Sequence, residues 1–133
     1  MAIIVRGDLQ AWQVLNVVAH CAARMANKMC GHFDTGEYFV TRDGKNHPRN
    51  SQYPIIVFRA DGSDDLRTLL MGVRSASLPH LAFIREMIDF TDDAELQKAL
   101  DGKTESELEY LGVGMFGEND TVKQLTRKFS LWK

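Results

Sequence analysis

Cysteine is scarce in this sequence of 133 residues, which holds only Cys21 and Cys30. Small domains that depend on disulfides carry four or more cysteines, so a disulfide framework is excluded. A zinc site is not indicated either, because no second pair of ligands stands at a spacing typical of such sites. We expect no metal, and both cysteines to be buried, reduced thiols.

Long apolar runs and an excess of basic residues are also absent. The longest uncharged apolar stretches have the length of a core helix, short of the roughly 20 residues that cross a bilayer. Met1 to Val5 is too short, before Arg6, to be a signal peptide. We therefore expect a cytoplasmic protein without a membrane partner. Sixteen basic and 18 acidic residues give a formal charge of −2, which argues against nucleic acid as a partner, because proteins that bind many phosphates are usually basic.

Segments with the apolar pattern of buried strands alternate along the chain with segments that have the apolar periodicity of helices. Runs typical of buried strands occupy residues 2–5, 54–59, 81–84 and 110–116, and helical patterns occupy residues 9–29, 63–75, 92–100 and 121–129. Asp8, Ser63 and Asp92 stand where they would cap three of these helices. The alternation predicts a single α/β domain over residues 1–133, with helices covering a central sheet.

The first predicted helix carries two stripes. One is apolar, is expected to face the core, and consists of Leu15, Val18, Ala22 and Met25. On the other, Trp12, Asn16 and His20 are spaced by four and therefore share a face. Asn16 and His20 either look into a cleft whose mouth is formed by Trp12, or belong to a polar side that meets solvent or a subunit partner.

Residues 32–52 are the least regular part of the sequence. Residues 37–41 have an extended pattern and Asp43-Gly44 predicts a turn, so we expect a small hairpin-like lobe. The lobe is either an anion-binding loop or a solvated connection, and exposed loops commonly have such charges. Its basic residues are Arg42, Lys45, His47 and Arg49.

Gly112, Gly114 and Gly117 match the dinucleotide-binding pattern G-x-G-x-x-G, after a strand and before a helix. Only sixteen further residues follow, without the returning strand and the acid that binds ribose. We therefore expect no cofactor. We expect these glycines instead to be small residues that fit a crowded central strand.

Glu86 follows the third predicted strand. Ligand sites in open α/β sheets gather beyond the strand ends, where a carboxylate can act as a base or orient a histidine. The alternative is a surface charge cluster with Arg85 and Asp89. The sequence offers neither a nucleophile elbow nor a histidine pair with metal-ligand spacing.

These residues make one candidate site. Asn16 is its expected hydrogen-bond donor, His20 its general base and Glu86 its orienting acid. The expected ligand-binding residues beside them are Asp8, Trp12 and Gln13.

Several segments resemble the type II peptidyl-tRNA hydrolases. These are IIVRGDL with the helix after it, PIIVFRADGSDDLRTLLMGVRSASLPHLAFIRE, and YLGVGMFGENDTVKQLTRKFSLWK. The resemblance covers nearly the whole chain except residues 32–52. Within that superfamily, DLQAWQVLN and YFVTRDG are still more similar to an uncharacterised branch, a domain of unknown function.

The resemblance implies a three-layer α/β/α sandwich with a mixed four-stranded sheet, the last strand antiparallel, and a homodimer. It also implies a metal-independent hydrolysis of the ester that joins a peptide to tRNA. The hydrolases' catalytic aspartate corresponds most nearly to Glu86, and their histidine falls near His20. Their first helix begins with lysines, whereas this chain has none between Leu9 and Met25.

Three functions follow as hypotheses. The first is a ligand-binding or regulatory module that takes a small molecule and lacks the hydrolase lysines. The second is a divergent hydrolase of an ester or of a peptidyl- or acyl-tRNA substrate. The third is a structural homodimer with Trp12 at the interface.

Overall fold

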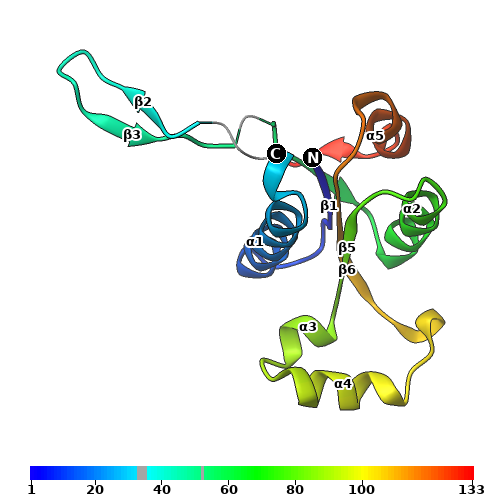
Figure 1. Cartoon of the computed structure of the whole chain (residues 1–133). Helices are drawn as coiled ribbons and strands as arrows, with labels where there is room; N and C mark the ends of the chain where they lie inside the picture. Colours follow the sequence, from blue (N-terminus) through cyan, green and yellow to red (C-terminus); the bar gives the residue numbers. More distant parts are fainter. Residues whose placement is uncertain (33–35, 52) are drawn as a thin grey trace.

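A mixed five-stranded sheet forms the centre of the computed structural model, which describes residues 1–32, 36–51 and 53–133 (Figure 1). Strands β1 and β4 are parallel, β6 is antiparallel to β1 and β5, and β7 is antiparallel to β4. The carboxyl ends of β1, β4 and β5 therefore meet at one edge of the sheet, which we call the carboxyl edge. In spatial order the strands are β5 (His80–Ile84), β6 (Tyr110–Met115), β1 (Ala2–Arg6), β4 (Ile56–Ala60) and β7 (Ser130–Leu131).

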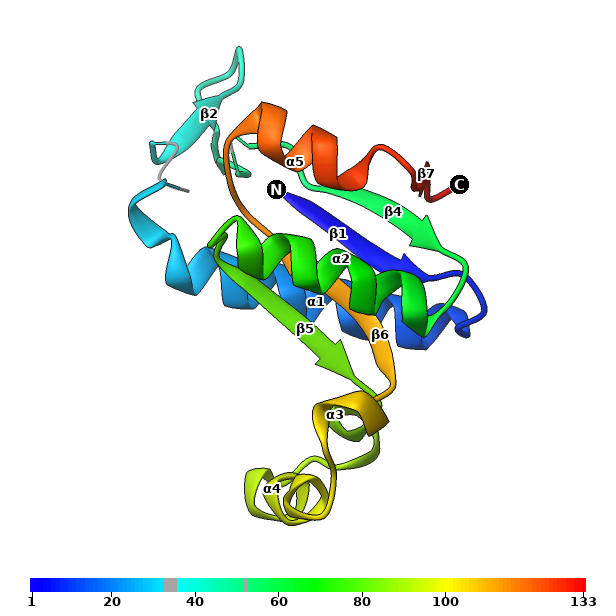
Figure 2. The ribbon, with the colours of Figure 1, turned by 90° about the vertical axis from the view of Figure 1, so that its right-hand side faces the viewer.

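Helices cover both faces of this sheet (Figures 1 and 2). Helix α1 (Ala11–Lys28) lies on one face, and α2 (Ser63–Ser75) and α5 (Asn119–Thr126) lie on the other. Two hydrophobic cores lie on the two faces of the sheet, because successive side chains of β1 point to opposite faces. Ile3 and Val5 pack under α1, whereas Ile4 packs under α2. The structure is thus a mixed α/β protein with a helix, sheet and helix layer.

Strand β6 is buried along its whole length between the two helix layers. A Cβ atom on Gly112 would lie 2.4 Å from Cγ1 of Val17, and one on Gly114 would lie 2.8 Å from Cβ of Cys21. These glycines therefore allow α1 to approach the sheet, in agreement with the prediction of a crowded central strand.

Two segments extend away from the sheet (Figure 1). After α1 and a 3₁₀ turn (Cys30–His32), the hairpin of β2 (Tyr38–Val40) and β3 (Asn46–Pro48) turns at Gly44, whose φ is +80°. The hairpin lies within residues 32–52, the range of the predicted lobe, of which positions 33–35 and 52 lie outside the described residues. Between β5 and β6 an arm carries α3 (Glu86–Asp89), α4 (Asp93–Asp101) and a 3₁₀ turn (Glu105–Glu107).

The C-terminal region differs from the prediction. The sheet has five strands rather than four, because α5 ends at Thr126 and not near residue 129. Residues 130–131 then pair with β4, and the amide of Trp132 donates to the carbonyl of Val57 at 3.0 Å. A two-residue edge strand has too few positions to show a strand periodicity in the sequence.

Two predicted helix caps are wrong and one is confirmed. Gln10 rather than Asp8 is the N-cap of α1, and Gly62 rather than Ser63 is the N-cap of α2. Both predicted residues have other partners, because Asp8 pairs with Arg6 and Ser63 accepts from the amide of Tyr110 at 2.9 Å. Asp92 caps α4 as predicted and accepts from two amides of its first turn.

Burial of α1 differs from the predicted apolar stripe. Leu15 is 69% exposed, whereas Met25 is buried as predicted. The residues of α1 that are buried are Val14, Val17, Cys21 and Met25. Both cysteines are free thiols, but only Cys21 is buried, whereas Cys30 is exposed, contrary to the prediction. Burial raises the pKa of the Cys21 thiol to about 12.

Candidate functional site

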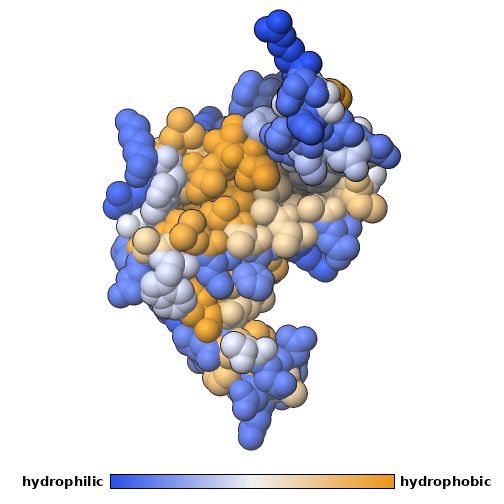
Figure 3. Space-filling view, turned by 90° about the vertical axis from the view of Figure 1, so that its left-hand side faces the viewer, coloured by the Kyte–Doolittle hydropathy of each residue, from blue (hydrophilic) through white to orange (hydrophobic). Residues whose placement is uncertain are grey.

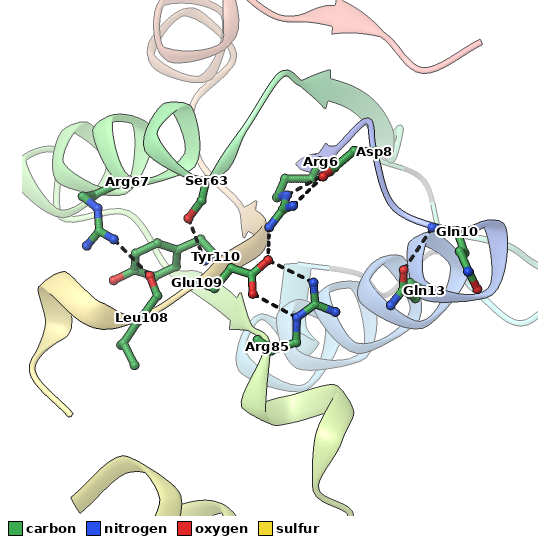
Figure 4. A network of polar contacts seen from close by, with 10 residues as sticks. All are labelled: Arg6, Asp8, Gln10, Gln13, Ser63, Arg67, Arg85, Leu108, Glu109 and Tyr110. Atoms are coloured by element: carbon green, nitrogen blue, oxygen red, sulfur yellow. Dashed lines mark hydrogen bonds and ion pairs between the residues drawn. The ribbon is translucent and has the colours of Figure 1, made fainter. Parts of the chain in front are cut away.

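Four charged side chains form a clamp at the carboxyl edge (Figure 4). Both carboxylate oxygens of Glu109 accept from the guanidinium of Arg85, at 2.9 and 3.0 Å, and one also accepts from Arg6. Arg6 in turn donates two bonds to Asp8, at 2.5 and 2.9 Å. The clamp thus ties together the ends of β1 and β5 and the residue before β6.

The clamp holds each of its groups in the charged form. Hydrogen bonds from Arg85, and then from Arg6, lower the pKa of Glu109 to about 2. The bond from Arg6 also lowers the pKa of Asp8. Two guanidinium groups face two carboxylates, so the cluster is neutral as a whole. Such a cluster holds strand ends together and offers little attraction to an anionic ligand.

A second group of contacts fastens the returning end of the arm to α2 (Figure 4). The guanidinium of Arg67 donates to the carbonyls of Glu105, Ser106 and Leu108, at 2.9 to 3.2 Å, and lies over the ring of Tyr110. The Tyr110 hydroxyl donates to the Glu105 carboxylate at 3.0 Å. These contacts fix the path of the chain into β6.

Three predicted ligand-binding residues take part in local structure. Asp8 belongs to the clamp. The indole nitrogen of Trp12 donates to the side-chain oxygen of Gln10 at 2.8 Å, and the backbone amide of Gln10 donates to the side chain of Gln13 at 3.0 Å. Trp12 is nevertheless 54% exposed, so its ring remains accessible.

The three predicted catalytic residues lie on α1 and at the start of α3. His20 is exposed, with its ring centroid 5.4 Å from that of Phe83. Glu86 is 3% exposed and accepts from the ammonium of Lys103 at 2.5 Å. Among the residues that the structure describes, one buried oxygen of Glu86 and the buried amide oxygen of Asn16 have no hydrogen-bond partner. Within the described part of the chain, no hydrogen bond or ion pair joins these three side chains to one another.

A cavity of about 720 Å³ opens at the opposite, amino edge of the sheet. Its walls come from the starts of β1 and β4, the end of α1, the loop after β6, and α5. Apolar side chains dominate the wall and include Met29, Pro54, Phe58, Leu78 and Val122. A second hollow between α2 and α5, of about 470 Å³, is lined by more polar residues.

Aromatic rings form one side of the larger cavity. The ring of Phe116 lies between those of His32 and Tyr53, with centroids 5.8 and 5.4 Å away. The contact with Tyr53 is edge to face, a favoured geometry for aromatic pairs. Polar groups at the margin come from Glu118, Asn119 and Lys123. None of the six predicted site residues lines this cavity.

Sequence reasoning named Asp8 and Arg85 but missed the clamp that joins them, and it missed the aromatic wall of the cavity, for different reasons. Oppositely charged residues at strand ends, such as Arg6, Arg85 and Glu109, were a signal for the clamp, but strand order was needed to pair them. Tyr53 and Phe116 had no signal, because residues 63 positions apart in the chain form one wall only after folding.

Two classes of site find no support in the structure. No group of three or more His, Cys, Asp or Glu side chains able to hold a metal ion occurs within residues 1–32, 36–51 and 53–133. None of the helices in the described ranges is long and apolar enough to cross a membrane.

Comparisons with known proteins give a family and a fold. A family model described as "Protein of unknown function (DUF2000)" matches residues 1–133. A solved structure of a protein of unknown function, Atu0240 from Agrobacterium tumefaciens strain C58, is similar with a TM-score of 0.84 and 23% identity. The similarity covers 99% of this chain and 96% of that one, and at this identity it shows the fold alone. No curated protein matches the chain.

Proposed function

The chain belongs to the DUF2000 family of proteins of unknown function, and we propose that it is a small-molecule-binding module whose ligand occupies the cavity at the amino edge. The observation that carries this proposal is a largely apolar cavity of about 720 Å³. Ligand sites in proteins are typically concave, about 300–1,000 Å³ in volume, and mostly apolar with a few polar groups. This cavity has all three properties.

The wall favours a ligand with a planar aromatic body. Phe116, flanked by His32 and Tyr53, offers ring edges and faces at one side of the cavity. A planar ring packs on such surfaces by offset or edge-to-face contacts, each worth about 0.5–1.5 kcal/mol beyond area burial. Asn119 and Lys123, at the margin, supply hydrogen-bond donors for a polar substituent.

The elements that line the cavity suggest how a ligand would affect the protein. They come from both termini and from the base of the hairpin, so a bound ligand would tie together segments that are distant in sequence. A ligand that binds only the folded state stabilises it by about 2.7 kcal/mol at one hundred times its dissociation constant. Binding of such a ligand would therefore be seen as a rise in the melting temperature.

The test is binding of the fluorescent aromatic probe 8-anilinonaphthalene-1-sulfonate to the full chain. We expect saturable binding that Met29→Trp weakens at least tenfold, because the larger, rigid indole takes up part of the cavity that the probe would occupy. The matched control is Met71→Trp, on an exposed part of α2 outside the cavity, which should leave binding unchanged. A thermal-shift screen of aromatic acids and nucleotides on the wild type would then search for the natural ligand class.

Two results would contradict the proposal. One is probe binding that Met29→Trp and Met71→Trp affect equally, because the probe would then lie elsewhere. The other is an absence of saturable binding together with a flat thermal-shift response across all compounds.

A divergent hydrolase is the second candidate, supported by the unpartnered buried oxygens of Asn16 and Glu86. Buried polar groups without partners are costly and often mark sites that bind or act. Glu86 also follows β5 at the carboxyl edge, where catalytic groups of α/β folds are common. In this proposal Asn16 is a donor, His20 the general base and Glu86 the acid that orients it.

A peptidyl-tRNA hydrolysis assay distinguishes this candidate. If the site is catalytic, wild-type protein hydrolyses the ester and His20→Ala reduces the rate by about 100-fold or more, the range for loss of a general base. His47→Ala, on the hairpin, is the control. An inactive wild type, or equal rates for both variants, would contradict hydrolysis of this substrate by His20.

A further inference from the structure

The hairpin of β2 and β3 has an apolar face that is exposed in the described part of the chain. Tyr38 stands opposite Pro48 and Val40 opposite Asn46, so Tyr38, Val40 and Pro48 share a face. Tyr38 is 46% and Val40 67% exposed. On the other face, Phe39 is 53% exposed, and the guanidinium of Arg49 lies 4.7 Å from the centroid of its ring. An isolated two-stranded hairpin is marginally stable in water, so its apolar face needs a surface to pack against.

A second uncovered apolar surface lies on α1 and the adjoining part of the sheet. Among the described residues, α1 packs mainly on β1, β5 and β6 and less on β4 and β7. At 100° per residue, Leu15, Val18 and Ala22 lie on the flank of α1 opposite to that of Asn16 and His20. We call this surface the α1–β4 patch; its members are Leu15, Val18, Ala22, Ile55, Val57 and Trp132.

Figure 3 shows the face of the molecule that carries α1. Apolar side chains gather there into one continuous area, beside the hydrophilic outer part of the hairpin. Val18, Ala22, Val57 and Trp132 pack against the same buried cluster, which makes the patch continuous with the core. Contiguous apolar surface of this kind marks an interaction site in a water-soluble domain.

The total exposed area of the chain is larger than that of a compact monomer of the same mass. The chain exposes 8574 Å², whereas surface scaling gives about 7,100 Å² for a compact monomer of 15.1 kDa. The projecting hairpin and the arm of α3 and α4 both contribute to this excess of about 1,500 Å² (Figure 1), and a standard interface needs roughly 800 Å² from each partner. A net charge of −2 opposes self-association only weakly.

We propose that the apolar face of the hairpin of one copy docks on the α1–β4 patch of a second copy, so that two copies exchange their hairpins in a symmetric dimer. A two-fold axis makes both contacts identical, so each hairpin and each patch is covered once. The occupant is a second copy because this chain itself supplies both surfaces, an apolar hairpin face and an apolar patch beside it.

Light scattering after size-exclusion chromatography tests the assembly on the full chain. We expect twice the mass of one chain, and at least tenfold weaker association for both Val40→Glu and Leu15→Glu. The controls are His47→Glu, on the other face of the hairpin, and Met71→Glu on α2. Met71 is 68% exposed and Leu15 69%, so the two helix variants are matched in exposure. Circular dichroism checks that each variant is folded.

A disulfide trap tests which surfaces meet. Chains that carry Cys30→Ser with Val40→Cys are mixed with chains that carry Cys30→Ser with Leu15→Cys, so only a contact between copies can join them. Cys21 is buried and does not interfere. We expect a mixed disulfide dimer, and none when Met71→Cys replaces Leu15→Cys. A monomeric wild type, or equal trapping at both positions, would overturn the proposal.

Discussion

Glu109 is the residue on which the carboxyl edge depends most directly. Its carboxylate accepts from both Arg85 and Arg6, and these bonds lower its pKa to about 2. Without it, two guanidinium groups that repel one another would remain at the ends of β1 and β5. A single carboxylate thus allows two cations to lie side by side.

We expect Glu109→Gln to lower the free energy of unfolding at neutral pH by about 1 kcal/mol, because its side chain is 40% exposed and solvent screens the pairs. A lowered pKa means that the stabilisation is complete above the ordinary value of 4.5 and is lost as the pH falls toward 2. Denaturant unfolding across this range should therefore show the difference from wild type shrinking. Glu95→Gln, in α4, is the control.

The opposite outcome for Glu109 would be a difference that stays constant as the pH falls from 4.5 to 2. Such a result would mean that the charge of Glu109 contributes nothing to the free energy of unfolding.

Single residues also explain the wrong cap predictions. Asp8 and Ser63 are residue types that commonly cap helices, but in this structure they bind Arg6 and the amide of Tyr110.

At the scale of elements, the approach of α1 to β6 depends on the lack of side chains at Gly112 and Gly114. A Cβ on Gly112 would meet Cγ1 of Val17 at 2.4 Å and the carbonyl oxygen of Ile4 at 3.1 Å. Neither the buried Val17 nor the strand backbone can move away easily, because both are packed on all sides.

We expect Gly112→Ala to destabilise the protein by about 1–3 kcal/mol, the usual cost of overpacking. Adding Val17→Ala should recover part of this loss in a double-mutant cycle, because the removed methyl groups are those in conflict. Gly102→Ala is the control, since nothing lies within 4 Å of its Cβ position. If Gly112→Ala were as harmless as Gly102→Ala, the close contact of α1 with β6 would not hold in solution.

Another element-scale result concerns the apolar stripe of α1. Periodicity predicted Leu15, Val18, Ala22 and Met25 as one core face, but the buried face is rotated, with Leu15 exposed. The buried residues Val14, Val17, Cys21 and Met25 lie on the neighbouring side of the helix, so the sheet covers the predicted stripe only in part. Its uncovered part is the flank that enters the α1–β4 patch.

At the scale of the whole molecule, the two ends of the sheet differ in chemistry. The carboxyl edge is closed by charged and hydrogen-bonded side chains, whereas the amino edge is hollow, apolar and aromatic. Glu86 was expected beyond the strand ends, and none of the three candidate catalytic residues lines the cavity. The binding and hydrolysis proposals therefore make separate predictions, and one can fail without the other.

The sequence alone determined the class of the fold and most of its elements. Strands 2–5, 81–84 and 110–116, the helices between them, the hairpin turn at Asp43-Gly44 and the glycines of β6 follow from local periodicity and from residue size. Such features depend on neighbours a few residues away, which a sequence displays directly.

Only the tertiary structure decided the rest. The edge strand β7, the partners of Arg6 and Glu109, the rotation of α1 and the wall of His32, Tyr53 and Phe116 all depend on strand order. Each requires residues tens of positions apart to meet, and the free energy of such contacts is set by packing over the whole core. No local pattern records it, so the cavity and the clamp emerge only when the chain is folded.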